Sequence, residues 1–186
     1  PLYSSAASDV YKRQDIGKTF DMTAIYMDEF PVTNLDFYRF VKSRKYNPID
    51  TSNYLKHWRH GKPSKEIENK PVVYVSIEDA RAYAAWSKKR IPTEIEWQYA
   101  AQTTSLNEWP WEQKKPVVRK KEFVTETLTV INIEGIDSSF CNLGNGKLDD
   151  VGAYPKGVNP NGLHDLVGAV WQLTNDEYIN GSYRYI

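Results

Sequence analysis

Three stretches of the chain carry the same signal for the start of a helix: a Ser or Thr, an acidic residue three positions later, and apolar residues at helical spacing. The pairs are Thr33 with Asp36, Ser76 with Asp79, and Thr93 with Glu96. In such a pair the hydroxyl and the carboxylate bind backbone N–H groups that the first helical turn leaves unpaired. Pro92 keeps Ile91 extended, so the second helix must end before it. The sequence therefore predicts three short helices separated by long stretches of another kind.

Those stretches contain strand-like segments and loops. Apolar and polar residues alternate over residues 20–26 and 124–131, as in strands with one face exposed to water. Polar residues, Gly, Pro, Asn and Asp fill residues 47–70 and 142–161, which is typical of loops and turns. We therefore expect an α+β chain with a large share of coil.

Length and charge exclude several classes of protein. The chain has 186 residues, with 24 Lys and Arg against 24 Asp and Glu, which suits one domain without net charge. A nucleic-acid-binding protein carries a basic surplus, so we expect no nucleic-acid partner. No apolar run approaches the roughly 18–20 residues that cross a bilayer, so we predict no transmembrane segment. The aromatic share of 13% favours loops packed by side chains, or a binding face.

Cysteine and histidine offer little chemistry. Cys141 is the one cysteine in the sequence, which excludes an internal disulfide and a cysteine-pair zinc site. A lone cysteine without a histidine near it in sequence is typical of a small buried residue. His57 and His60 have the spacing of a metal pair, but no third ligand lies near them. We interpret them as two surface histidines.

The first residues differ from the rest of the chain. Residues 1–14 contain a small, polar run and lead into no periodic pattern. We interpret them as a non-native or disordered leader and exclude them from reasoning about the fold, with a natural flexible terminus as the alternative. The chain begins with Pro rather than Met, so we expect its natural start to be missing.

Four motifs follow one another along the chain. They are FPVTN at 30–34, PVVYVS at 71–76, KRIPTEIEWQYAA at 89–101 and PNGLHDLVGAVWQLT at 160–174. Together they resemble the blocks of the formylglycine-generating enzyme family, also called sulfatase-modifying factors. The resemblance implies an incomplete domain over residues 15–186 with a C-type-lectin-like fold: short antiparallel sheets, two to three helices and abundant ordered coil. We interpret Arg90, Glu94 and Glu96 in the third block as a polar network and helix cap, not as catalytic residues.

The chemistry of the family implies a copper site. Its members oxidise a sulfatase cysteine to formylglycine with oxygen and a copper ion held by two cysteines, and thiolates are the ligands that Cu(I) selects. In the family these cysteines follow the block that here contains Trp171, whereas Cys141 precedes it. We therefore assign no catalytic residue, expect copper only if two cysteines follow Ile186, and expect this chain by itself to be inactive.

The resemblance also implies calcium positions. They fall on Asn142, Leu143, Gly168, Val170 and Gln172. Calcium takes several oxygen ligands, preferably charged, whereas relatives carry Asn and Glu where this chain has Ala169 and Gln172. We expect calcium binding to be weak at best. Asp149 and Asp150 could complete the position near Asn142, although a solvated turn is the favoured interpretation.

Three functions stay open. The first is a formylglycine-generating oxidase with a protein or peptide substrate. The second is a non-catalytic binding or cell-envelope structural protein of the same fold, which Ala169 and Gln172 favour, and which would place the protein in the cell envelope or periplasm. The third is a non-haem iron oxidase of the ergothioneine-synthase type, whose iron ligands come from a separate helical domain that nothing here resembles.

Overall fold

The computed structural model describes residues 23–103, 109–111, 138–144, 146–179 and 182–185, and the structural statements below concern these residues. In chain order the elements are α2 (Asn34–Arg44), the 3-10 helix η1 (Lys65–Ile67), α3 (Ile77–Trp86), α4 (Glu94–Gln102), the 3-10 helix η2 (Pro155–Gly157), and the strands β1 (Leu173–Ile179) and β2 (Ser182–Tyr185). The strands pair antiparallel, with irregular register. Helices beside a small sheet agree with the predicted α+β class.

All three predicted helix starts are confirmed. The Ser76 hydroxyl accepts the Asp79 N–H at 3.1 Å while the Asp79 carboxylate accepts the Ser76 N–H at 2.7 Å, and α4 begins with the same reciprocal pair. At α2 the Thr33 hydroxyl accepts the Asp36 N–H at 3.1 Å but donates to the Asp36 carboxylate at 2.7 Å. The pair of Thr33 and Asp36 therefore caps α2 through the threonine hydroxyl alone.

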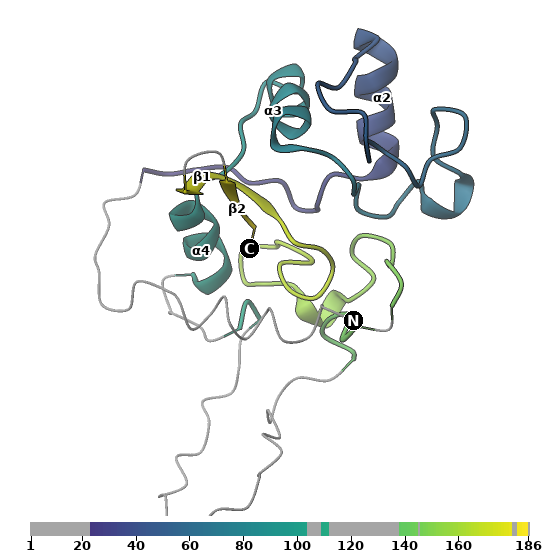
Figure 1. Cartoon of the computed structure of the whole chain (residues 1–186). Coiled ribbons are helices and arrows are strands. Elements are labelled where there is room, and N and C mark those ends of the chain that lie inside the picture. The colour runs from purple at the N-terminus through teal and green to yellow at the C-terminus, as the bar shows by residue number, and fades with distance from the viewer. Residues whose placement is uncertain (1–22, 104–108, 112–137, 145, 180–181, 186) are drawn as a thin grey trace, which may run out of the picture.

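The helices belong to two apolar clusters. Figure 1 shows α2 and α3 side by side, with α4 and the two strands next to them. The first cluster joins α2 to the following loop through Phe37, Phe40, Leu55 and Trp58. The second joins α4 to a much later loop through Trp97, Ala100, Ala101, Leu163 and Leu166. Because β1 contacts both α3 and α4, it links the two parts.

One buried asparagine orders much of the loop over residues 47–70. Asn34 is 1% exposed, and its amide nitrogen donates to three backbone carbonyls, those of Ile67, Lys70 and Pro71, at 3.0, 2.9 and 3.2 Å. Its amide oxygen lies 2.7 Å from the Trp58 indole nitrogen and 2.8 Å from His57 Nε2. One side chain thus ties α2 to several points of a coil that also has backbone hydrogen bonds of its own.

His57 corrects one prediction. Its ring is half-buried and bound to Asn34, so it is not a surface histidine, whereas His60 is exposed as expected. The local sequence did not indicate this burial, because the partner Asn34 lies 23 residues earlier in the chain.

Other predictions fall differently. Residues 23–28 form no strand, and Tyr26 is fully exposed, so the alternating pattern does not produce a strand over the described part of residues 20–26. The predicted leader at 1–14 and the predicted strand at 124–131 lie outside the described residues. Within the described part of the chain, no helix has the length and hydropathy needed to cross a bilayer.

Candidate functional site

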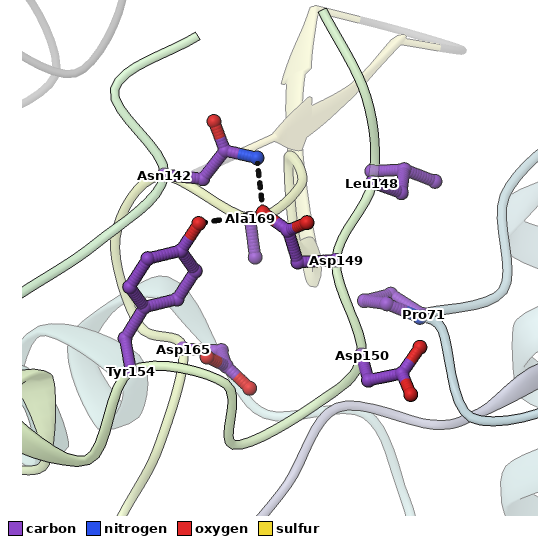
Figure 2. Close-up of a pocket in the computed structure, with 8 residues that line it drawn as sticks. All are labelled: Pro71, Asn142, Leu148, Asp149, Asp150, Tyr154, Asp165 and Ala169. Carbon is purple, nitrogen blue, oxygen red and sulfur yellow. Dashed lines mark hydrogen bonds between the residues drawn. The ribbon is translucent and has the colours of Figure 1, made fainter. Parts of the chain in front are cut away.

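A small pocket forms where the PVVYVS segment meets the late loops. Its walls are formed by Pro71, Asn142, Leu148, Asp149, Asp150, Tyr154, Asp165 and Ala169. Figure 2 shows the carboxylate of Asp149 at its centre, between Asn142 and Tyr154. Three carboxylates and one amide line this small space, so the pocket is the first place to look for the predicted calcium positions.

Asp149 is held by two donors. Its Oδ2 accepts hydrogen bonds from the Asn142 amide at 3.0 Å and from the Tyr154 hydroxyl at 2.5 Å. The bond to Asp149 raises the pKa of Tyr154 to about 12, so the phenol stays a donor at neutral pH. Asp149 is therefore fixed by hydrogen bonds within a half-exposed turn.

Asp150 and Asp165 complete the acidic wall differently. Asp150 is exposed and lies 3.4 Å from the ammonium of Lys70, which also donates to the Leu148 carbonyl at 2.6 Å. Asp165 accepts the Gly152 N–H at 2.7 Å, and burial raises the pKa of its carboxyl, an effect that this hydrogen bond opposes. One lysine thus already supplies positive charge at this wall.

Of the two predicted calcium positions nearest the pocket, Asn142 is engaged in the chain's own hydrogen bonds. Asn142 is buried; its Oδ1 accepts the Gly144 N–H at 2.8 Å and its Nδ2 donates to the Lys147 carbonyl at 2.8 Å. The Leu143 side chain is exposed and offers no oxygen. The amide oxygen that a metal would need is therefore engaged within the loop.

The structure brings Gly168 to this loop. Its φ is +85°, and a Cβ placed on it would lie 2.6 Å from the Asn142 carbonyl oxygen and 3.0 Å from Cys141 Cβ. Ala169, the next residue, lines the pocket without a side-chain oxygen. The predicted positions Asn142 and Gly168 therefore do meet, through a close approach that only glycine allows.

Gln172 lies outside the pocket lining. Its Oε1 accepts the indole N–H of Trp97 at 2.9 Å, and its Nε2 donates to the Asp165 carbonyl at 3.0 Å. Val170 is half-buried, and its aliphatic side chain has no atom that could ligate a metal. The structure therefore brings Gly168 against Asn142, whereas the side chain of Gln172 forms a separate bridge.

Sequence reasoning missed the roles of Tyr154 and Asp165. Both line the pocket. The available signal was that Asp165 is an acidic residue inside a conspicuous motif. In the described ranges no group of three or more His, Cys, Asp or Glu side chains is arranged to hold a metal ion.

Cys141 lies in the core. It is 3% exposed and packs with Trp109 and Trp111, with Phe140 at the edge of the cluster. Trp111 stacks on Trp109 at 5.7 Å and on Phe140 at 5.2 Å between ring centroids. The predicted buried thiol is confirmed.

The third motif forms the expected polar network. Arg90 donates to both carboxylate oxygens of Glu96 at 2.6 Å, and these bonds are the main reason why the pKa of Glu96 falls to about 2. Glu94 donates its backbone N–H to the Asp176 carboxylate at 2.5 Å, which ties α4 to β1. These contacts cap and anchor a helix, as the sequence predicted.

Fold and site together define a class of protein: an α+β domain whose long loops are fixed by buried polar side chains, with an acidic pocket and one buried thiol. The family model of the sulfatase-modifying factor enzyme 1-like domain matches residues 5–185, and the chain belongs to this family. The resemblance seen in the four motifs is thereby confirmed.

Individual relatives agree. The chain is 27% identical to the formylglycine-generating enzyme of Mus musculus, over 94% of this chain and 56% of that protein. It is 29% identical to the inactive C-alpha-formylglycine-generating enzyme 2 of Bos taurus, over 82% of this chain and 60% of that protein. The chain thus spans little more than half the length of these relatives.

A solved structure supports the fold. The structure of PvdO from Pseudomonas aeruginosa has a TM-score of 0.54, with 20% identity over 82% of this chain and 56% of that chain. At this identity the likeness concerns the fold alone.

Proposed function

We propose that this chain is the scaffold of a formylglycine-generating-enzyme-like protein, an oxidase that converts a cysteine of a protein substrate to formylglycine. The support is the family match over residues 5–185, together with the likeness to a mouse enzyme of that name. The intact network around Arg90, Glu96 and Trp97 supports a folded scaffold but carries no chemistry of its own.

The state of Cys141 carries the second half of the proposal: this chain does not itself perform the oxidation. A Cu(I) site of the family type needs two thiolates within reach of one ion. The sequence contains one cysteine, and that thiol is buried among Trp109, Trp111 and Phe140. A thiol buried among aromatic rings is poorly placed to bind copper or to attack a substrate.

We also propose that the whole domain has the C-type-lectin-like fold. Regular elements are short, and long loops are fixed by side-chain hydrogen bonds such as those of Asn34, Asn142 and Asn159. Loops ordered in this way suit a fold that builds its surface from coil.

A second candidate is a non-catalytic binding or envelope protein of the same fold. Two observations favour it: Ala169 contributes no oxygen to the pocket, and the chain is similar to a bovine relative named as inactive. A scaffold of this kind could bind a peptide without transforming it. No contact among the described residues favours the iron oxidase.

The complete natural protein distinguishes the two candidates. It would be incubated with copper, oxygen and a sulfatase-derived cysteine peptide, and the peptide analysed by mass spectrometry. Conversion to formylglycine supports the oxidase. Binding of the peptide by calorimetry without conversion supports the second candidate, and neither conversion nor binding contradicts both.

A further inference from the structure

The side-chain amide of Gln172 joins three segments of the chain. Its oxygen accepts from Trp97 on α4 at 2.9 Å, its nitrogen donates to the Asp165 carbonyl at 3.0 Å, and its own backbone directly precedes β1. Trp97 is 3% exposed and lies in the cluster with Leu163 and Leu166. The bridge therefore sits at the edge of an apolar core, where hydrogen bonds are screened little by water.

We infer that the neutral amide of Gln172 joins the loop over residues 163–172 to α4 without a metal ion, so that this part of the fold is independent of calcium. The inference rests on family membership and on these contacts, and it holds whichever candidate function is correct.

The bridge offers calcium a poor set of ligands. Calcium prefers several oxygen ligands, some of them charged, whereas Gln172 supplies one neutral amide oxygen that already accepts the Trp97 N–H, and the Asp165 carbonyl already accepts the Gln172 N–H. An ion between them would meet the N–H groups of the Gln172 amide, which carry partial positive charge.

Neighbouring residues agree with a loop built without an ion. Because Gly168 has no Cβ, its backbone can approach the Asn142 carbonyl closely; a Cβ there would lie 2.6 Å from that oxygen. Ala169 presents a methyl group, which cannot ligate a metal, to the pocket. Direct packing and an amide bridge thus hold the two sides of this turn.

The first test uses the unaltered chain. Thermal unfolding would be followed by circular dichroism in EDTA and in millimolar CaCl2, with MgCl2 at equal ionic strength as the control. We expect the same Tm in all three. A rise in Tm specific to CaCl2 contradicts the inference, because a ligand that binds only the folded state stabilises it.

The second test converts the bridge to an oxygen site. Gln172→Glu keeps the acceptor for Trp97 but turns the donor into a carboxylate oxygen facing the Asp165 carbonyl. We expect its Tm in EDTA to fall by about 3–8 °C and to recover partly in CaCl2. Gln172→Ala is the matched control and should lose stability in both buffers. A Gln172→Glu variant as stable as the unaltered chain in EDTA contradicts the inference.

A third measurement needs no variant to fold. In the nitrogen-15-labelled chain, the Trp97 indole proton should exchange slowly with solvent at equal rates in EDTA and CaCl2. Slow exchange that appears only with calcium overturns the inference.

Discussion

Trp97 and Gln172 are 75 residues apart in sequence and meet through one hydrogen bond of 2.9 Å, from the indole nitrogen to the amide oxygen. Trp97 belongs to the third family-like motif and Gln172 to the fourth. The bond therefore joins the two motifs directly, at the edge of the core that α4 shares with Leu163 and Leu166.

Trp97→Phe tests this junction. Phenylalanine keeps an aromatic ring in the core but removes the indole donor, which leaves Gln172 Oε1 unpaired. We expect the free energy of unfolding to fall by about 1–3 kcal/mol, measured by urea denaturation. Tyr99→Phe, on the exposed face of the same helix, is the control and should change it by less than about 0.5 kcal/mol.

Gly168→Ala tests the close approach beside Asn142. Both Gly168 and Gly162 have a positive φ, +85° and +82°, but a Cβ meets nothing within 4 Å at Gly162 and the Asn142 carbonyl at 2.6 Å at Gly168. Alanine should cost about 1 kcal/mol at Gly162, from backbone strain alone, and about 1–3 kcal/mol more at Gly168. Equal losses in urea denaturation would mean that the contact is absent.

His57 makes stability depend on pH. The amide nitrogen of Asn34 donates to three backbone carbonyls, so its oxygen must accept from His57, and His57 Nε2 therefore carries the proton. The buried Nδ1 of His57 has no hydrogen-bond partner among the described residues. Burial lowers the pKa of His57 below its ordinary value of 6.5. The unfolded chain therefore binds more protons than the folded chain below that pH, and stability falls as the pH falls through it.

The effect of His57 is measured by urea denaturation between pH 8 and pH 5. The unaltered chain should lose stability below pH 6.5, by at most about 1.4 kcal/mol per pH unit from this group. His57→Gln, which keeps a donor toward Asn34, should flatten the dependence. His60→Asn is the control, because His60 is exposed with φ +53° and Asn accepts that conformation. If the control flattens the curve equally, the assignment to His57 is wrong.

Glu96 contributes at lower pH. Its pKa of about 2 in the folded chain, set mainly by Arg90, lies below the unfolded value near 4.5. The stabilisation is present above the unfolded value and is lost as the pH falls toward 2. Glu96→Gln should cost about 1–2 kcal/mol at pH 7, a modest value because Arg90 is 64% exposed. Glu78→Gln, exposed in the first turn of α3, should cost much less; an equal cost at both sites would contradict the role of the pair.

The helix starts were predictable because the information is local. Ser76 with Asp79, and Thr93 with Glu96, act over three residues, and the structure places each bond where the spacing indicates. The burial of Cys141 was predictable for a similar reason, since a lone thiol without a charged neighbour favours the core.

The pocket and the loop order were not predictable in this way. Asp149, Tyr154 and Asp165 come together with Pro71 only through the path of the whole chain. The family resemblance pointed to Asn142 and Gln172 as candidate calcium positions, but the direction of the Gln172 amide depends on a partner distant in sequence. A local pattern can also mislead. Residues 23–28 form no strand although the sequence there alternates, because a strand needs a neighbouring strand to accept its hydrogen bonds.

The proposal that this scaffold carries no oxidase chemistry of its own is tested most directly by its product. The 186-residue chain would be incubated with copper, oxygen and a sulfatase-derived cysteine peptide, and the peptide analysed by mass spectrometry beside a Cys141→Ser variant. We predict no formylglycine above background from either. Formylglycine from the unaltered chain that disappears in Cys141→Ser would contradict the account, because it would make the buried thiol a catalytic group.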